Sequence, residues 1–213
     1  MNVSFTSRRF LAGAVASMML AVPAQATTFA VFDGITAGVT TFDGTVTSAG
    51  GTLLSDVWTN MSVSNVIDRG DYTITRNDGS YMFPTTYGDM SGQVLRIDPD
   101  GGGSNPRTDP ADYFDSGFTL TFDNPVNAVG FEVGDWATCC FELTTDLFMS
   151  LDGGNPILVA SADMRSQGEF PSQDDPSDLV PEIFVAAFDD TGEFNSLSFW
   201  GNGIDEVLVA GGQ

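Results

Sequence analysis

The stretch Gly117-Phe-Thr-Leu-Thr-Phe-Asp-Asn-Pro-Val-Asn-Ala-Val-Gly-Phe-Glu-Val-Gly-Asp135 decides the fold class of this chain. Large apolar residues alternate with threonines over 118–122, and they alternate with Gly and Glu over 129–133. Successive side chains of a strand point to opposite faces, so each segment has one apolar face and Glu132 points outward. The Asp-Asn-Pro sequence at 123–125 is typical of a turn. We therefore predict an antiparallel hairpin with one buried face.

Similar segments recur along the chain, between clusters of Gly, Asp, Asn and Pro. Residues 147–151 alternate before a turn at 152–155, which leads into an apolar segment at 157–159. Residues 53–67 fit either a strand or a short helix, and no long helical periodicity is found. The pattern predicts an all-β fold, an antiparallel β-sandwich that is jelly-roll-like. Its other strands are expected at 29–32, 72–76, 94–97, 183–188, 197–200 and 207–210.

The N-terminus is typical of a secretory signal peptide. Two arginines precede an apolar run over 10–22, and the Ala-Gln-Ala sequence at 24–26 matches the small-x-small pattern that signal peptidase cleaves. The apolar run is shorter than the roughly 20 residues that a membrane-spanning helix needs. We therefore expect residues 1–26 to be removed. Residues 27–213 should then form one domain that is secreted, periplasmic or at the cell surface, without stable membrane insertion.

The chain is strongly acidic, with 29 acidic residues, seven basic residues and a formal net charge of −22. Nucleic acids and anionic lipids are bound through basic groups, so we expect neither as a partner. The charge favours either solubility in salt or the binding of divalent cations. All the basic residues are arginine and the chain has no His, which excludes imidazole bases, Ser-His or Cys-His nucleophiles, typical zinc sites and lysine Schiff bases. Paired carboxylates are the remaining route to catalysis.

Cys139 and Cys140 are adjacent and are the only cysteines. In an oxidising compartment they have three alternatives: a vicinal disulfide, a bridge to another chain, or two reduced and buried thiols. The vicinal disulfide would stiffen the loop after Trp136. Because it closes almost no chain, it would add little stability through loop entropy.

Asp98, Asp100 and Asp109 occupy the first, third and twelfth positions of an acidic loop that has a glycine at its sixth position. Oxygen ligands at these positions surround calcium in the loop of an EF-hand. The match is incomplete, since the fifth position is Gly and the twelfth is Asp rather than Glu. The loop is therefore interpreted either as a calcium site or as a solvated acidic loop.

Trp136 is the candidate ligand platform. Gly and Asp precede it and Ala and Thr follow it, which indicates a strand that leaves the sheet and enters a loop. An exposed aromatic ring at that place could stack against a sugar, although aromatic residues are also common in the cores of sandwiches. The same two interpretations apply to Trp58, Trp200, Tyr72, Tyr81, Tyr87 and Tyr113.

Short motifs in the second half of the chain carry a resemblance to a known group. They lie at 118–122, 124–131, 134–136, 197–201 and 203–207. In these motifs the chain resembles the jelly-roll-type β-sandwiches of exported bacterial proteins that are sorted by exosortase, the PEP-CTERM group. The sorting tail of that group does not follow the last strand, so the resemblance implies no anchor. It implies a surface, matrix or binding role, and it brings no catalytic residues.

Together these features predict a non-catalytic, exported binding or cell-surface module whose partner is an extracellular glycan or matrix component. Two alternatives stay open: a purely structural surface protein with calcium-stabilised loops, and a carboxylate-dependent glycoside hydrolase or lyase. A binding module should expose an aromatic ring beside polar groups in a groove. An enzyme would need two facing carboxylates in a cleft, with the pKa of one of them raised.

Overall fold

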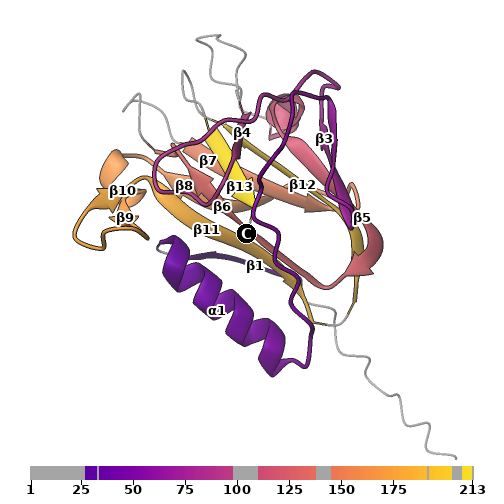
Figure 1. Cartoon of the computed structure of the whole chain (residues 1–213), viewed down its shortest axis with the longest axis horizontal. Helices are drawn as coiled ribbons and strands as arrows, with labels where there is room; N and C mark the ends of the chain where they lie inside the picture. The colour runs from indigo at the N-terminus through magenta and orange to yellow at the C-terminus, as the bar shows by residue number, and fades with distance from the viewer. Residues whose placement is uncertain are drawn as a thin grey trace, which may run out of the picture.

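The computed structural model describes residues 27–32, 34–97, 110–137, 145–190, 192–202 and 208–212. Most of the described strands form two sheets that face each other, and a helix lies on the outer face of one of them (Figure 1). All pairs of neighbouring strands are antiparallel. The predicted antiparallel β-sandwich is therefore confirmed, while its jelly-roll-like connectivity stays a prediction.

The five-stranded sheet has the order β1 (Thr27–Phe32), β11 (Glu182–Asp189), β6 (Ala128–Gly134), β13 (Leu208–Gly212) and β4 (Val94–Ile97). The six-stranded sheet has the order β2 (Val66–Asp68), β3 (Tyr72–Arg76), β5 (Phe118–Val126), β12 (Phe194–Asn202), β7 (Thr145–Leu151) and β8 (Ile157–Ala162). A separate short pair consists of β9 (Phe170–Pro171) and β10 (Leu179–Val180). The described helical segments are α1 (Ile35–Ser48) and the 3-10 helices η1 (Pro110–Ser116) and η2 (Arg165–Gln167).

The core between the two sheets is rich in aromatic rings. Phe118 of β5 contacts Phe131 of β6 in the opposite sheet, with ring centroids 6.0 Å apart, and Phe199 of β12, with ring centroids 5.9 Å apart. Trp58, from the segment between α1 and β2, packs against the same ring at 6.0 Å. All four side chains are buried. Because each removes a large apolar area from water, this cluster holds the sheets together.

The predicted hairpin over 117–135 is wrong, although both of its strands are present. β5 pairs with β3 and β12, whereas β6 pairs with β11 and β13 in the other sheet. The chain crosses from one sheet to the other at Asn127, between β5 and β6. Alternation indicates which face of a strand is buried, but it does not identify the strand beside it.

Most of the other predicted strands are confirmed. β3 and β4 have the predicted bounds, and β7 pairs with β8 as a hairpin around the predicted turn at 152–155. Residues 53–67, which fitted a strand or a helix, are mainly irregular and enter β2 at Val66.

The sequence does not predict the helix α1. It is rich in threonine, valine and glycine, which have low helix propensity. The helix lies on the outer face of the five-stranded sheet (Figure 1), where Gly38 and Phe42 contact Phe184 of β11. Threonine hydroxyls also donate hydrogen bonds to carbonyl groups one turn earlier, as Thr40 does to Thr36. Packing against β11 therefore stabilises a helix that the local sequence does not favour.

Candidate functional site

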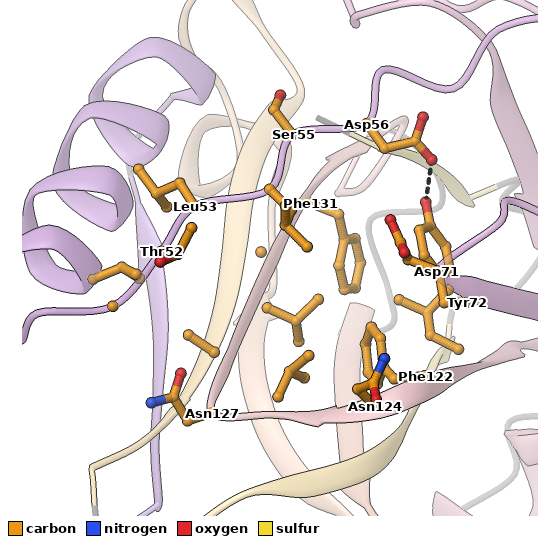
Figure 2. Close-up of a pocket in the computed structure, with 18 of the residues that line it drawn as sticks. Thr52, Leu53, Ser55, Asp56, Asp71, Tyr72, Phe122, Asn124, Asn127 and Phe131 are labelled. Atoms are coloured by element: carbon orange, nitrogen blue, oxygen red, sulfur yellow. Dashed lines mark hydrogen bonds between the residues drawn. The ribbon is translucent and has the colours of Figure 1, made fainter.

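A cavity of about 540 Å³ opens at the end of the sandwich where the chain crosses from β5 to β6 (Figure 2). Strands of both sheets contribute to its walls, and residues 51–56 and Trp58, which follow α1, cover one side. The volume falls within the range of about 300–1,000 Å³ that is typical of small-molecule sites. The cavity is therefore the candidate functional site.

The floor of the cavity is apolar. Phe122 and Leu120 come from β5, and Phe131 and Val129 come from β6 in the opposite sheet. Phe122 is half-buried, and its ring lies 6.0 Å from the ring of Tyr72. A floor of this kind can pack against the apolar face of a ligand.

Exposed polar side chains gather at the mouth of the cavity. They are Thr52, Ser55, Asp71, Asn124, Asn127 and Glu193. Figure 2 shows Asn124 and Asn127 beside the connection between β5 and β6, and Asp71 next to Tyr72. The amides both donate and accept hydrogen bonds, and ionised carboxylates accept them. The mouth can therefore bind groups such as hydroxyls, which also donate and accept.

Hydrogen bonds fix one wall of the cavity before any ligand binds. Trp58 Nε1 donates to the Tyr72 hydroxyl at 2.8 Å. This hydroxyl donates to Asp56 Oδ2 at 2.7 Å, the bond drawn in Figure 2. Arg69 donates to the same carboxylate, from Nε to Oδ2 at 2.8 Å and from Nη2 to Oδ1 at 2.5 Å. Such a two-point pair sets the orientation of both groups. The wall is therefore preorganised.

The protonation states of this wall follow from the same contacts. The hydrogen bond from Arg69 lowers the pKa of Asp56 below its ordinary value, and the hydrogen bond from Tyr72 and the charge of Arg69 lower it further. Burial raises the pKa of Tyr72, as does its hydrogen bond with Asp56. Asp56 is therefore ionised and Tyr72 neutral at physiological pH. Because the Tyr72 hydroxyl already donates its proton to Asp56, it has none left to donate to a ligand.

The backbone of β6 also borders the cavity. β13 pairs with β6 only over 131–134, and β11 pairs with the other edge of β6. No described strand pairs with the β13-side edge of residues 128–130, which line the cavity. A strand edge without a described partner offers N–H and C=O groups. Backbone groups can therefore add to the contacts from the rim.

Trp136, the predicted platform, lies outside this cavity and is only 3 % exposed. The turn of η2 covers it, because Gly168 packs against the indole ring. Trp58 and Trp200 are buried as well. Among the aromatic residues considered as platforms, Tyr81 is exposed, at 63 %, but it does not line the cavity. In the part of the chain that the structure describes, no tryptophan presents its face to solvent.

Five predicted site residues lie outside the described part of the chain: Cys139, Cys140, Asp98, Asp100 and Asp109. The vicinal disulfide and the calcium loop therefore stay predictions. Within the described ranges, no group of three or more His, Cys, Asp or Glu residues could hold a metal ion. No helix in the same ranges is long and apolar enough to cross a membrane.

The sequence offers Trp58 and Tyr72 as candidate platforms, and both line the cavity, but it does not indicate that the other lining residues form a site. Asn124 lay in a predicted turn, and Asp56 and Tyr72 lay in or after the ambiguous segment. Their proximity results from the pairing of β3 with β5, which joins distant parts of the chain. Comparisons with family models, curated proteins and solved structures find no match for this chain. The chemistry of the cavity is therefore the basis for inferring a function.

Proposed function

We propose that this protein is an exported, non-catalytic binding module that holds a neutral sugar unit of an extracellular glycan in the cavity between its sheets. The observation that carries the proposal is an apolar floor with the half-buried ring of Phe122, below a rim of carboxylates and amides. Sugar rings have apolar faces that pack on aromatic and aliphatic side chains, and their hydroxyls donate to and accept from such polar groups. The signal-like N-terminus supports export.

The charge of the site favours a neutral sugar over an anionic one. Arg69 is the basic residue of the cavity lining, and Asp56 already engages its guanidinium. Asp71 and Glu193 add negative charge at the mouth. Since the whole chain has a net charge of −22, a carboxylate, sulfate or phosphate on the ligand would be repelled.

The polar rim favours a sugar over a wholly apolar ligand. Such a ligand would cover rim groups such as Asn124 and Asn127 without offering them hydrogen bonds. A polar group that loses water without gaining a partner costs about 1–3 kcal/mol. A ligand with several hydroxyls avoids this cost.

The state of Asp56 supports binding rather than hydrolysis. A glycoside hydrolase needs a carboxylic acid that keeps its proton near neutral pH to protonate the leaving group. The pKa of Asp56 is shifted in the opposite direction, and Arg69 holds its carboxylate. Asp56 is therefore suited to hold the wall in place.

A substitution that fills the cavity tests the proposal. We expect the purified protein to bind neutral glycans on an array, and Val129→Phe to weaken binding of the best one by at least about tenfold, or 1.4 kcal/mol, in titration calorimetry. Val129 lines the cavity and is half-buried, so the larger ring would occupy the volume that the sugar needs.

The matched control is Val66→Phe, which adds the same ring at an exposed position outside the cavity. This variant should bind as the unaltered protein does, and circular dichroism should show that both variants are folded. Equal binding by the two variants, or a glycan array without any hit, would contradict the proposal.

A further inference from the structure

Two glutamates are buried on the outer face of the five-stranded sheet. Glu132 of β6 is 0 % exposed and Glu182 of β11 is 2 % exposed. Glu182 lies opposite Gly134 in the register, and Glu132 is two residues before Gly134, so both side chains share one face of neighbouring strands. Diagonal neighbours of this kind are within reach of each other's long side chains. The sequence indicates the outward direction of Glu132 but not its burial.

The segment 85–93, between β3 and β4, covers the two carboxyl groups. The N–H of Asp89 donates to Glu182 Oε1 at 3.0 Å, and the N–H of Ser91 donates to Glu132 Oε2 at 2.7 Å. Gly88 lies so close to the Glu182 carboxyl group that a Cβ there would displace this group. The two glutamates therefore fasten this segment to the sheet.

The residues that directly follow β9 make a second set of contacts with segment 85–93. Ser172 Oγ donates to the side chain of Asp89, and Gln173 Nε2 donates to its backbone carbonyl. Ser172 is itself buried. The carboxyl pair thus lies beneath a closed layer formed by two segments.

Among the described residues, one oxygen of each glutamate has no hydrogen-bond partner. These atoms are Glu132 Oε1 and Glu182 Oε2, and both are buried. An ionised carboxylate that is buried with an oxygen unsatisfied is very costly. A protonated carboxyl group carries less of this cost, because it has no net charge and its hydroxyl can donate.

The surroundings of the pair are acidic. Asp89 and Tyr87 face it from the covering segment, and Asp174 adds negative charge from the chain after β9. The neighbouring strands β1 and β13 have no charged residue, and the acidic residue of α1, Asp43, is exposed. The charge of Arg165 acts on Tyr87, but Arg165 is paired with Glu169. The Tyr87 hydroxyl donates a hydrogen bond to Asp135. No described cation neutralises the two glutamates.

Burial and the acidic surroundings favour the protonated form of the two glutamates. Burial is the main cause that raises the pKa of Glu182 to about 7, and the charges of Asp89, Glu132 and Asp174 act in the same direction. Burial also raises the pKa of Glu132. Opening the covering segment would expose both groups to water and return them toward their ordinary values.

We propose that Glu132 and Glu182 form a proton-dependent clasp, which holds segment 85–93 on the sheet while a carboxyl group is protonated and loosens it when both ionise. A proton suits this place because no described cation neutralises the pair and each buried carboxyl group keeps an oxygen without a described partner. The pKa of Glu182 is raised while segment 85–93 is closed. Its protonation therefore stabilises the closed segment fully below the ordinary pKa of 4.5, and this stabilisation is lost as the pH rises through about 7.

Amide hydrogen exchange of the purified protein tests the clasp. After correction for the intrinsic exchange rate, the protection of the Asp89 and Ser91 amides should fall at least about tenfold between about pH 5 and about pH 8, since each pKa unit corresponds to a factor of ten. Unchanged protection over this range would overturn the proposal.

Variants separate the clasp from a general effect of pH. Glu182→Gln and Glu132→Gln keep the shape of a neutral carboxyl group and cannot ionise, so each should reduce the pH dependence, and the double variant should remove it. Asp43→Asn, at the exposed acid of α1, should keep the full dependence. Persistence of the dependence in the single variants would count against the proposal. If calcium restored the protection at about pH 8 and a chelator reversed this effect, a bound cation rather than a proton would close the clasp, and the proposal would be overturned.

Discussion

Phe118→Ala is expected to lower the free energy of unfolding by about 3–5 kcal/mol, the usual cost of truncating a buried phenylalanine. The ring contacts Phe131 in the opposite sheet and also Trp58 and Phe199. Its removal leaves a cavity where the two sheets meet, and rigid aromatic neighbours cannot collapse into it. Urea unfolding followed by fluorescence gives the difference in free energy.

The matched control for this substitution is Phe83→Ala. Phe83 is exposed, so the same truncation should change the free energy of unfolding by less than about 0.5 kcal/mol. Similar losses in the two variants would mean that Phe118 does not join the sheets as the structure shows.

Asp56→Ala is expected to lower the free energy of unfolding by about 2–3 kcal/mol, since both Arg69 and Tyr72 lose their acceptor. The pKa of Asp56 is lowered in the folded protein, so its contribution is complete above the ordinary value of 3.8 and is lost as the pH falls through the lowered pKa. The difference between this variant and the unaltered protein should therefore shrink in acid. Denaturant unfolding at several pH values measures it.

Asp71→Ala is the matched control at the same wall. Asp71 is exposed at the mouth of the cavity, so its removal should leave stability within about 0.5 kcal/mol while it weakens sugar binding. Asp56→Ala should therefore mainly lower stability, whereas Asp71→Ala should mainly weaken sugar binding. If the two variants lost equal stability, the carboxylate of Asp56 would not anchor the wall.

The sequence predicts the strands well because burial of one face leaves a local pattern. Alternation over 118–122 and 129–133 identified the faces of β5 and β6 that meet in the core. The same pattern could not show that the two strands belong to different sheets, since pairing depends on β3, β11, β12 and β13, which lie far away in the chain. The helix α1 was missed for a related reason: contacts with β11 stabilise it.

The candidate site was harder to predict, because distant segments create it. Trp136 follows a strand and looked exposed, yet the turn that contains Gly168 covers it. Glu132 was placed correctly on the outer face, but its cover comes from residues 85–93. Asn127, at the crossing between the sheets, is a functional candidate only once the cavity is seen. Local patterns specify faces, whereas burial and cavities depend on tertiary contacts.

The most direct measurement of the central claim is the mapping of backbone amide shifts by NMR during titration with neutral mono- and disaccharides. We expect saturable shifts around the cavity mouth, at Asp71, Asn124 and Asn127, and along residues 128–130 of β6. Shifts centred instead on the exposed rings of Tyr81 and Phe83, or no shifts with any neutral sugar, would contradict it.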